Sequence, residues 1–106
     1  MAEVKLELLT GSGRVRNLAG HERGLAAREQ FNLASYDQSG EIVEVIVPDT
    51  LDAITISFFQ GMFAASVKDI GDKFLERYHF HASPVIMEQV LRGISRVRTD
   101  RTSTFN

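Results

Sequence analysis

The amino-acid sequence predicts one α/β domain with elements in the order βαβαβα. Its 106 residues are 43% apolar and 25% charged, which is typical of a compact domain with a single core. Short segments rich in strand formers alternate with longer segments whose apolar residues recur at helical spacing. Such alternation favours a small mixed or parallel sheet with helices packed on it.

A first strand is predicted over residues 4–9. Val4, Leu6 and Leu8 alternate onto one face of this segment, and the glycines of residues 10–13 favour a turn after it. We therefore expect a strand that carries these three side chains on the same face.

The next predicted elements are a loop, a helix and a central strand. Residues 14–20 are expected to form a loop with room for a short strand. Residues 21–34 contain good helix formers, with Gly24 as an early weak point. After a loop over 36–40, the β-branched segment 41–47 suits the interior of a sheet.

The middle of the chain predicts a buried helix that begins at Phe58. Pro48 ends the preceding strand, and Ser57 and Gln60 have the spacing of a capping box. Gly71 stands where a helix C-cap is expected. On the residues alone, Ser57 is the N-cap of this helix.

The remaining residues predict a third strand over 74–80 and a final helix. Ser83 and Pro84 are typical of a helix start, and arginines crowd the end of this helix near residue 98. The domain is thus expected to span residues 1–98, with a polar tail over 99–106 that frays.

Charge and composition narrow the class of protein. The net charge of −2 provides no overall basic field, so nucleic acid is not favoured as a partner. The absence of cysteine excludes disulfides and thiolate metal sites. No basic-then-apolar leader and no membrane-length apolar run is present, so we expect a cytoplasmic protein.

One stretch resembles a known bacterial family. The run from Ile54 to Phe63, with Ser57-Phe58 at its centre, follows Val45-Ile-Val-Pro-Asp-Thr-Leu-Asp52. Together with the glycine- and arginine-bearing stretch between Gly13 and Phe31, it resembles the STAS-like domain family of unknown function. This family is related to sulfate-transporter and anti-sigma-factor-antagonist domains. The resemblance covers residues 10 to 97 and implies a single STAS-like domain.

The resemblance also implies a function for Ser57. In the anti-sigma-factor antagonists, a serine at the start of the corresponding helix is phosphorylated by a kinase of the histidine-kinase-like ATPase fold. Thr55 is a second candidate acceptor. The sequence departs from that pattern, because Ile56 replaces an aspartate and the bulky Phe58 and Phe59 follow the serine.

The function expected from this resemblance is a non-catalytic regulatory module that binds a protein partner and needs no cofactor. The partner would be a histidine-kinase-like ATPase or another signalling protein, with a homodimer also open. The residues expected to contact a partner are Asp49, Asp52, Phe59, Gln60 and Met62.

Two other functions remain open. One is a ligand- or metal-binding domain or enzyme that uses His79 and His81, whose rings would share one side of a strand, with His21 or Glu76 as further metal ligands. In that hypothesis the arginines near Gly20, and Arg14 and Arg28 in particular, bind the ligand. The other is a structural homo-oligomer. A turn is favoured over a phosphate site at Gly11-Ser-Gly13-Arg14.

Overall fold

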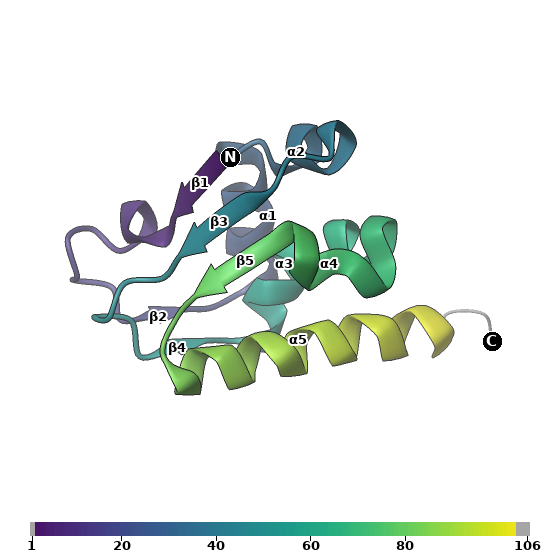
Figure 1. Ribbon diagram of the computed structural model, residues 1–106. Helices are drawn as coiled ribbons and strands as arrows, with labels where there is room; N and C mark the ends of the chain where they lie inside the picture. Colours follow the sequence, from purple (N-terminus) through teal and green to yellow (C-terminus); the bar gives the residue numbers. More distant parts are fainter. Residues whose placement is uncertain (1, 104–106) are drawn as a thin grey trace.

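A three-stranded parallel sheet forms one layer of the computed structural model (Figure 1), which describes the backbone of residues 2–103 and the side chains of residues 2–99. Its strands are β1 (Ala2–Lys5), β3 (Val43–Ile46) and β5 (Tyr78–His81), in the order β1-β3-β5. The register places Val4 beside Val45 and Val45 beside Phe80. The β-branched segment predicted to lie inside the sheet is indeed its central strand.

A second, two-stranded parallel ribbon lies at one end of the molecule. It consists of β2 (Asn17–Leu18) and β4 (Ala53–Ile54). The amides of Asp52 and Ala53 donate to the carbonyl of Arg16, and the amide of Thr55 donates to the carbonyl of Leu18. The short strand allowed for in the loop over 14–20 is confirmed.

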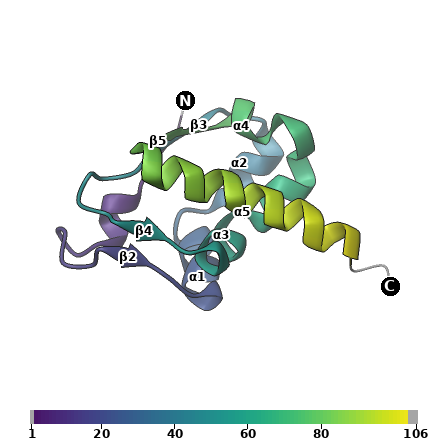
Figure 2. The ribbon, with the colours of Figure 1, turned by 90° about the horizontal axis from the view of Figure 1, so that it is seen from below.

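The helices gather on one side of the main sheet. They are α1 (His21–Gln30), α2 (Leu33–Ser39), α3 (Ile56–Ile70), α4 (Phe74–Arg77) and α5 (Pro84–Ser103), with 3₁₀ turns η1 (Leu6–Leu9) and η2 (Gly71–Lys73). In Figures 1 and 2, α1 and α3 lie behind the sheet and α5 runs beneath β5. Among the described elements none covers the opposite face, where Glu3 and Lys5 are exposed.

The core lies between the inner sheet face and α3. Val4, Val43 and Val45 are buried on that face, opposite aromatic side chains of α3. Phe59 and Phe63 of α3 pack with an aromatic group from the segment before β5 and from β5 itself, with ring centroids 5.0–6.5 Å apart; this group comprises Phe74, Tyr78 and Phe80. Within the described residues, no helix is both long and apolar enough to cross a membrane.

Two glycines allow α1 and α3 to touch along their backbones. A Cβ atom built on Gly24 would lie 2.2 Å from the carbonyl oxygen of Phe58, and one on Gly61 would lie 2.2 Å from that of His21. Neither position has room for a side chain. Gly24, predicted to be a weak point of its helix, is therefore the contact that brings α1 onto α3.

The α/β class and the parallel sheet are confirmed, but the element order is more complex than βαβαβα. The predicted first strand over residues 4–9 is wrong in its second half, because the chain turns into η1 at Leu6. Val4 and Leu6 are buried, whereas Leu8, predicted to share their face, is 68% exposed.

The predicted helix over 21–34 and the loop over 36–40 also need correction. The helix stops at Gln30 because Asn32 adopts the left-handed conformation, with φ 54° and ψ 48°, which asparagine tolerates. A second helix, α2, then occupies most of the predicted loop and ends at Gly40, where φ is 77°.

Two further predictions differ near the C-terminus. The strand predicted over 74–80 is a strand only from Tyr78, since residues 74–77 form α4 and bury Phe74. The final helix starts at Pro84 as predicted but continues through Ser103, so the predicted tail is helical over residues 99–103. The rest of that tail, residues 104–106, lies outside the described residues.

Candidate functional site

The start of α3 carries the predicted phosphoacceptors. Thr55, not Ser57, caps the helix, so the prediction of a Ser57 cap with Phe58 as the first helical residue is wrong. Thr55 has extended backbone angles, and its Oγ1 accepts a hydrogen bond from the amide of Phe58 at 3.2 Å. Ser57 lies in the first turn, exposed, with its hydroxyl 3.3 Å from that of Thr55.

The local reason for this start is the pairing of the two-stranded ribbon. The ladder ends at Ile54 of β4, and the amide of Thr55 is still held by the carbonyl of Leu18. Thr55 is therefore the last extended residue, and the helix begins at Ile56. Its hydroxyl is in place to satisfy one of the amides that every helix start leaves without an intrahelical acceptor.

The residues predicted to bind a partner fall into two groups. Asp49 and Asp52 are exposed in the connection before β4, and Gln60 is half-buried. Phe59 and Met62 are 1% and 0% exposed. These two side chains belong to the core, so they do not form part of a contact surface on the folded chain.

Asp52 is already engaged within the chain. Its carboxylate accepts two hydrogen bonds from the Arg16 guanidinium, at 2.9 and 3.2 Å. The hydrogen bond from Arg16 holds the pKa of Asp52 below its usual value. Both side chains are more than half exposed, so this pair orders the loop before β4 at the surface.

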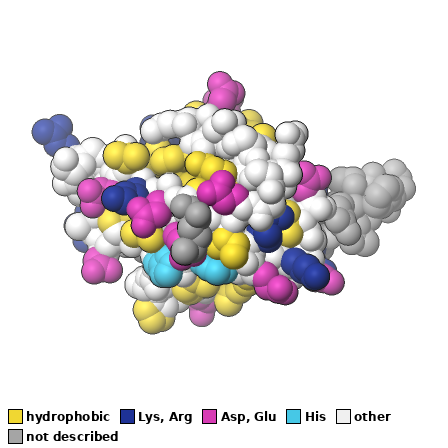
Figure 3. Space-filling model, turned by 45° about the horizontal axis from the view of Figure 1, so that its top comes forward, with side chains coloured by type: hydrophobic (Ala, Val, Ile, Leu, Met, Phe, Trp, Pro, Cys, Tyr) yellow, Lys and Arg dark blue, Asp and Glu magenta, His cyan; other side chains and the backbone are white. Residues whose placement is uncertain are grey.

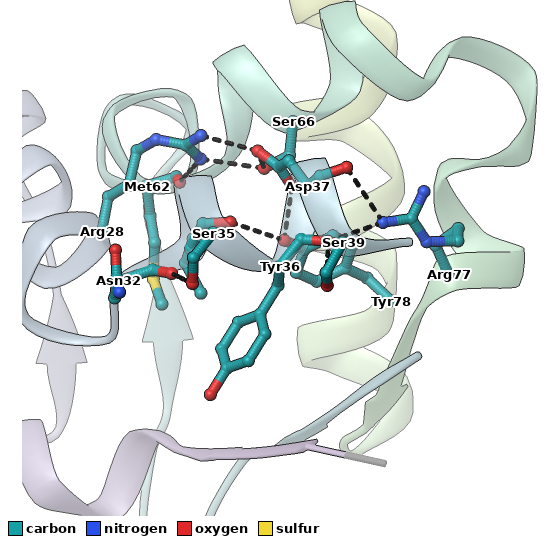
Figure 4. Close-up of polar contacts among 11 residues, drawn as sticks. Arg28, Asn32, Ser35, Tyr36, Asp37, Ser39, Met62, Ser66, Arg77 and Tyr78 are labelled. Atoms are coloured by element: carbon teal, nitrogen blue, oxygen red, sulfur yellow. Dashed lines mark hydrogen bonds and ion pairs between the residues drawn. The ribbon is translucent and has the colours of Figure 1, made fainter. Parts of the chain in front are cut away.

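A buried polar cluster joins α1, α2, α3 and β5 (Figure 4). The Asp37 side chain, only 2% exposed, accepts hydrogen bonds from Arg28 at 2.7 Å, Ser66 at 2.7 Å and Tyr78 at 2.5 Å. Arg28 also donates to the Ser66 hydroxyl at 2.8 Å and to the carbonyl of Met62 at 3.1 Å. Arg28, predicted as a ligand-binding arginine, is thus committed to an internal ion pair.

The cluster perturbs the titration of its phenol. Burial raises the pKa of Tyr78 far above its usual value of 10, and the hydrogen bond to the Asp37 carboxylate raises it further. Arg77 flanks the cluster and donates to the backbone carbonyls of Tyr36 and Asp37. Its Nε is buried and finds no hydrogen-bond partner among the described residues.

Sequence reasoning missed Asp37, Ser66 and Tyr78 as partners of Arg28. Asp37 lies in a segment predicted to be a loop, and Ser66 and Tyr78 are separated from Arg28 by 38 and 50 positions. No local motif marks such a cluster, because its members meet only when α2 packs beside α3.

The two histidines lie on the uncovered face of the sheet, as predicted for residues that alternate along one strand. Glu44 of β3 lies between them: its carboxylate contacts Nδ1 of His79 at 3.0 Å and Nε2 of His81. The hydrogen bond with His81 is the main cause that lowers the pKa of Glu44. In Figure 3, histidine, acidic and hydrophobic side chains gather on this part of the surface.

The predicted metal ligands do not converge. Across residues 2–99, no group of three or more histidine, cysteine or acidic side chains has an arrangement that could hold a metal ion. His21 begins α1, and Glu76 is exposed in α4, where its backbone carbonyl contacts Nε2 of His79.

The glycine-rich segment before Arg14 forms a turn. Gly11, Ser12 and Gly13 all have positive φ, and the buried Thr10 hydroxyl donates to the carbonyl of Glu7 and accepts from the amide of Gly13. Arg14 itself is exposed. Arg14 and Arg28 therefore lie in different environments and do not form one ligand site.

The architecture defines a small α/β domain whose parallel sheet is covered by helices on one face. Compared with protein-family models, with curated proteins and with solved structures, the chain matches none. The residues of the chain itself are therefore the basis for its function.

Proposed function

We propose that this chain is a non-catalytic, cytoplasmic protein-interaction module of the STAS-like type, and that phosphorylation of Ser57 controls its binding. The observation that carries the proposal is the position of Ser57. Its hydroxyl is exposed in the first turn of α3, while the adjacent Phe58 anchors the same turn in the core with 2% exposure.

The N-terminus of a long helix suits an added phosphate. α3 runs for 15 residues, and its dipole places partial positive charge at Ser57. A phosphate adds nearly two negative charges and three hydrogen-bond acceptors. The domain would therefore stay folded while the charge of the surface around Ser57 changes.

The surroundings of Ser57 fit a contact surface. Thr55 and Asp49 are exposed close to it in the chain, and the pair of Arg16 and Asp52 orders the preceding loop. A protein partner would thus meet a fixed backbone with exposed polar side chains. In this proposal the partner is a histidine-kinase-like ATPase or another signalling protein that supplies or reads the phosphate.

Phosphosite mapping on the protein purified from its native host tests the proposal. We expect one phosphate on Ser57, lost in Ser57→Ala and retained in Ser95→Ala, a matched control because Ser95 is exposed on α5. Capture of partners with Ser57→Ala and Ser57→Glu as bait should give different amounts of the same protein. An unmodified Ser57 together with identical capture by both variants would contradict the proposal.

A further inference from the structure

A small pocket lies directly beneath the first turn of α3. It has a volume of about 210 Å³. Its lining comes from η1, from β2 and the residues just before and after it, from α1 and from α3. Those that matter for its chemistry are Val15, Leu18, Ala26, Phe58, Arg23 and Gln30. Phe58, the residue after Ser57, connects this pocket to the surface assigned above.

The pocket is apolar within and open to solvent. Leu18 and Phe58 are buried in its wall, whereas Ala26 is exposed and Val15 is 36% exposed. A concave, largely apolar surface with a few polar groups is typical of a binding site. At about 210 Å³ it is smaller than the roughly 300–1,000 Å³ of small-molecule sites, which favours one anchoring side chain of a larger partner.

Arg23 gives the pocket its charge. It is the one charged residue among those that line the pocket, and within the described part of the chain its guanidinium has no hydrogen-bond or ion-pair partner. In contrast, Arg28 is paired with Asp37 and Arg16 with Asp52. A ligand carboxylate therefore meets an arginine that is not already neutralised, and Gln30 offers an amide at the same pocket.

We propose that this pocket binds an acidic segment of a partner protein, with one large apolar side chain inserted beside Phe58 and a neighbouring carboxylate paired with Arg23. The inference rests on the proposed function and names the chemistry of the partner at that surface. It also gives phosphorylation a direction. A phosphate on Ser57 is one residue from Phe58, within the Debye length of about 8 Å, so it repels the acidic segment and releases it.

The test is a titration of the ¹⁵N-labelled chain with blocked pentapeptides, followed by backbone amide shifts. Glu-Glu-Phe-Glu-Glu should produce saturable shifts at Leu18 and in α1. Lys-Lys-Phe-Lys-Lys and Glu-Glu-Ala-Glu-Glu should bind at least about fivefold more weakly, because each lacks one of the two matched features.

Variants locate the binding site. Ala26→Trp fills the pocket and Arg23→Glu reverses its charge, so each should weaken binding of the phenylalanine peptide at least about fivefold. Ala65→Trp and Arg96→Glu are matched controls at exposed positions of α3 and α5 and should leave binding unchanged. Circular dichroism verifies that each variant is folded.

Three results would overturn the inference: no saturable shifts, equal binding of the acidic and basic peptides, or equal binding to wild type and Ala26→Trp. Saturable binding of 3-phenylpropionate without binding of the peptide would identify a small-acid site instead. None of these results depends on the modification of Ser57, so the pocket and the phosphoacceptor can fail separately.

Discussion

The hydroxyls of Thr55 and Ser57 are two residues apart but have different roles. Thr55 satisfies the amide of Phe58, whereas Ser57 projects from the first turn and is exposed. Stability at this site is thus carried by one residue, and the proposed modification by the other. This separation leaves Ser57 available for chemistry without loss of the cap.

Substitution distinguishes the two roles. Thr55→Ala removes the cap and should lower the free energy of unfolding by about 1 kcal/mol, as cap removals do. Ser57→Ala should change it by less than about 0.5 kcal/mol, because Ser57 caps nothing and is exposed. Urea denaturation followed by circular dichroism measures both, and Thr55→Ser should retain most of the stability. A larger loss for Ser57→Ala than for Thr55→Ala would contradict the assignment.

The sequence alone could not select the correct cap. Either hydroxyl could accept a hydrogen bond from the amide three positions later, which is that of Phe58 for Thr55 and that of Gln60 for Ser57. What decides between them is the pairing of β4 with β2, which keeps the chain extended through Ile54. That pairing joins residues 36 positions apart and leaves no local signal.

At the scale of elements, the contact of α1 with α3 depends on Gly24 and Gly61. Each glycine lies against the backbone of the opposite helix. A Cβ atom built on either glycine would lie 3.0 Å from the Cα atom of the other glycine. Helix axes approach this closely only where side chains are absent. Gly93 likewise allows α5 to pack closely on the Phe59 side chain, because a Cβ atom on Gly93 would lie 2.4 Å from the Phe59 ring.

We expect Gly61→Ala to destabilise the domain although alanine is the better helix former. Helix propensity favours alanine by about 1 kcal/mol. The clash with the His21 carbonyl is with backbone, which cannot rotate away, so the helices must separate at a cost of about 3 kcal/mol or more. Ala65→Gly, on the exposed side of α3, is the control and should cost only about 1 kcal/mol. Thermal denaturation compares the two variants. An increase in melting temperature for Gly61→Ala would show that the contact between α1 and α3 has room for a methyl group.

Elements with a strong local pattern were predicted well, and those set by tertiary contacts were not. The β-branched strand around Val45, the Gly71 end of α3 and the Pro84 start of α5 follow from local chemistry. The 3₁₀ turn after β1 and the short helix α4 do not follow from local chemistry. Both segments alternate apolar and polar residues, and this pattern predicted strands at both places. The left-handed Asn32 ends the helix predicted over 21–34 early, and the next helix, α2, falls mainly in the predicted loop.

At the scale of the whole molecule, the Asp37 cluster is the polar counterpart of the aromatic core. It connects α1 through Arg28, α3 through Ser66 and β5 through Tyr78. A buried carboxylate is tolerated because three donors satisfy it and one of them is a cation. The cluster therefore links the helical layer to the sheet, and its state affects the stability of the entire domain.

The raised pKa of Tyr78 makes that stability sensitive to alkaline pH. In the folded chain burial and Asp37 keep the phenol protonated, whereas in the unfolded chain it ionises near pH 10. Because the folded pKa is the higher one, the stabilisation is complete below pH 10 and is lost as the pH rises toward the folded pKa. One such group changes the free energy of unfolding by about 1.4 kcal/mol per pH unit in that interval.

Comparison with Tyr78→Phe isolates this effect from the other groups that titrate at high pH. Between pH 9 and pH 11, the wild-type chain should lose about 1.4 kcal/mol more than Tyr78→Phe, measured by urea denaturation at each pH. At pH 7 the variant should be the less stable protein by about 1–3 kcal/mol, because Asp37 then lacks a donor. Tyr36→Phe is the matched control for the loss of a tyrosine hydroxyl: its hydroxyl has no part in the cluster, so the Tyr78-dependent loss of stability should remain in that variant. Parallel pH curves for wild type and Tyr78→Phe would mean that Tyr78 ionises as readily in the folded chain as in the unfolded one.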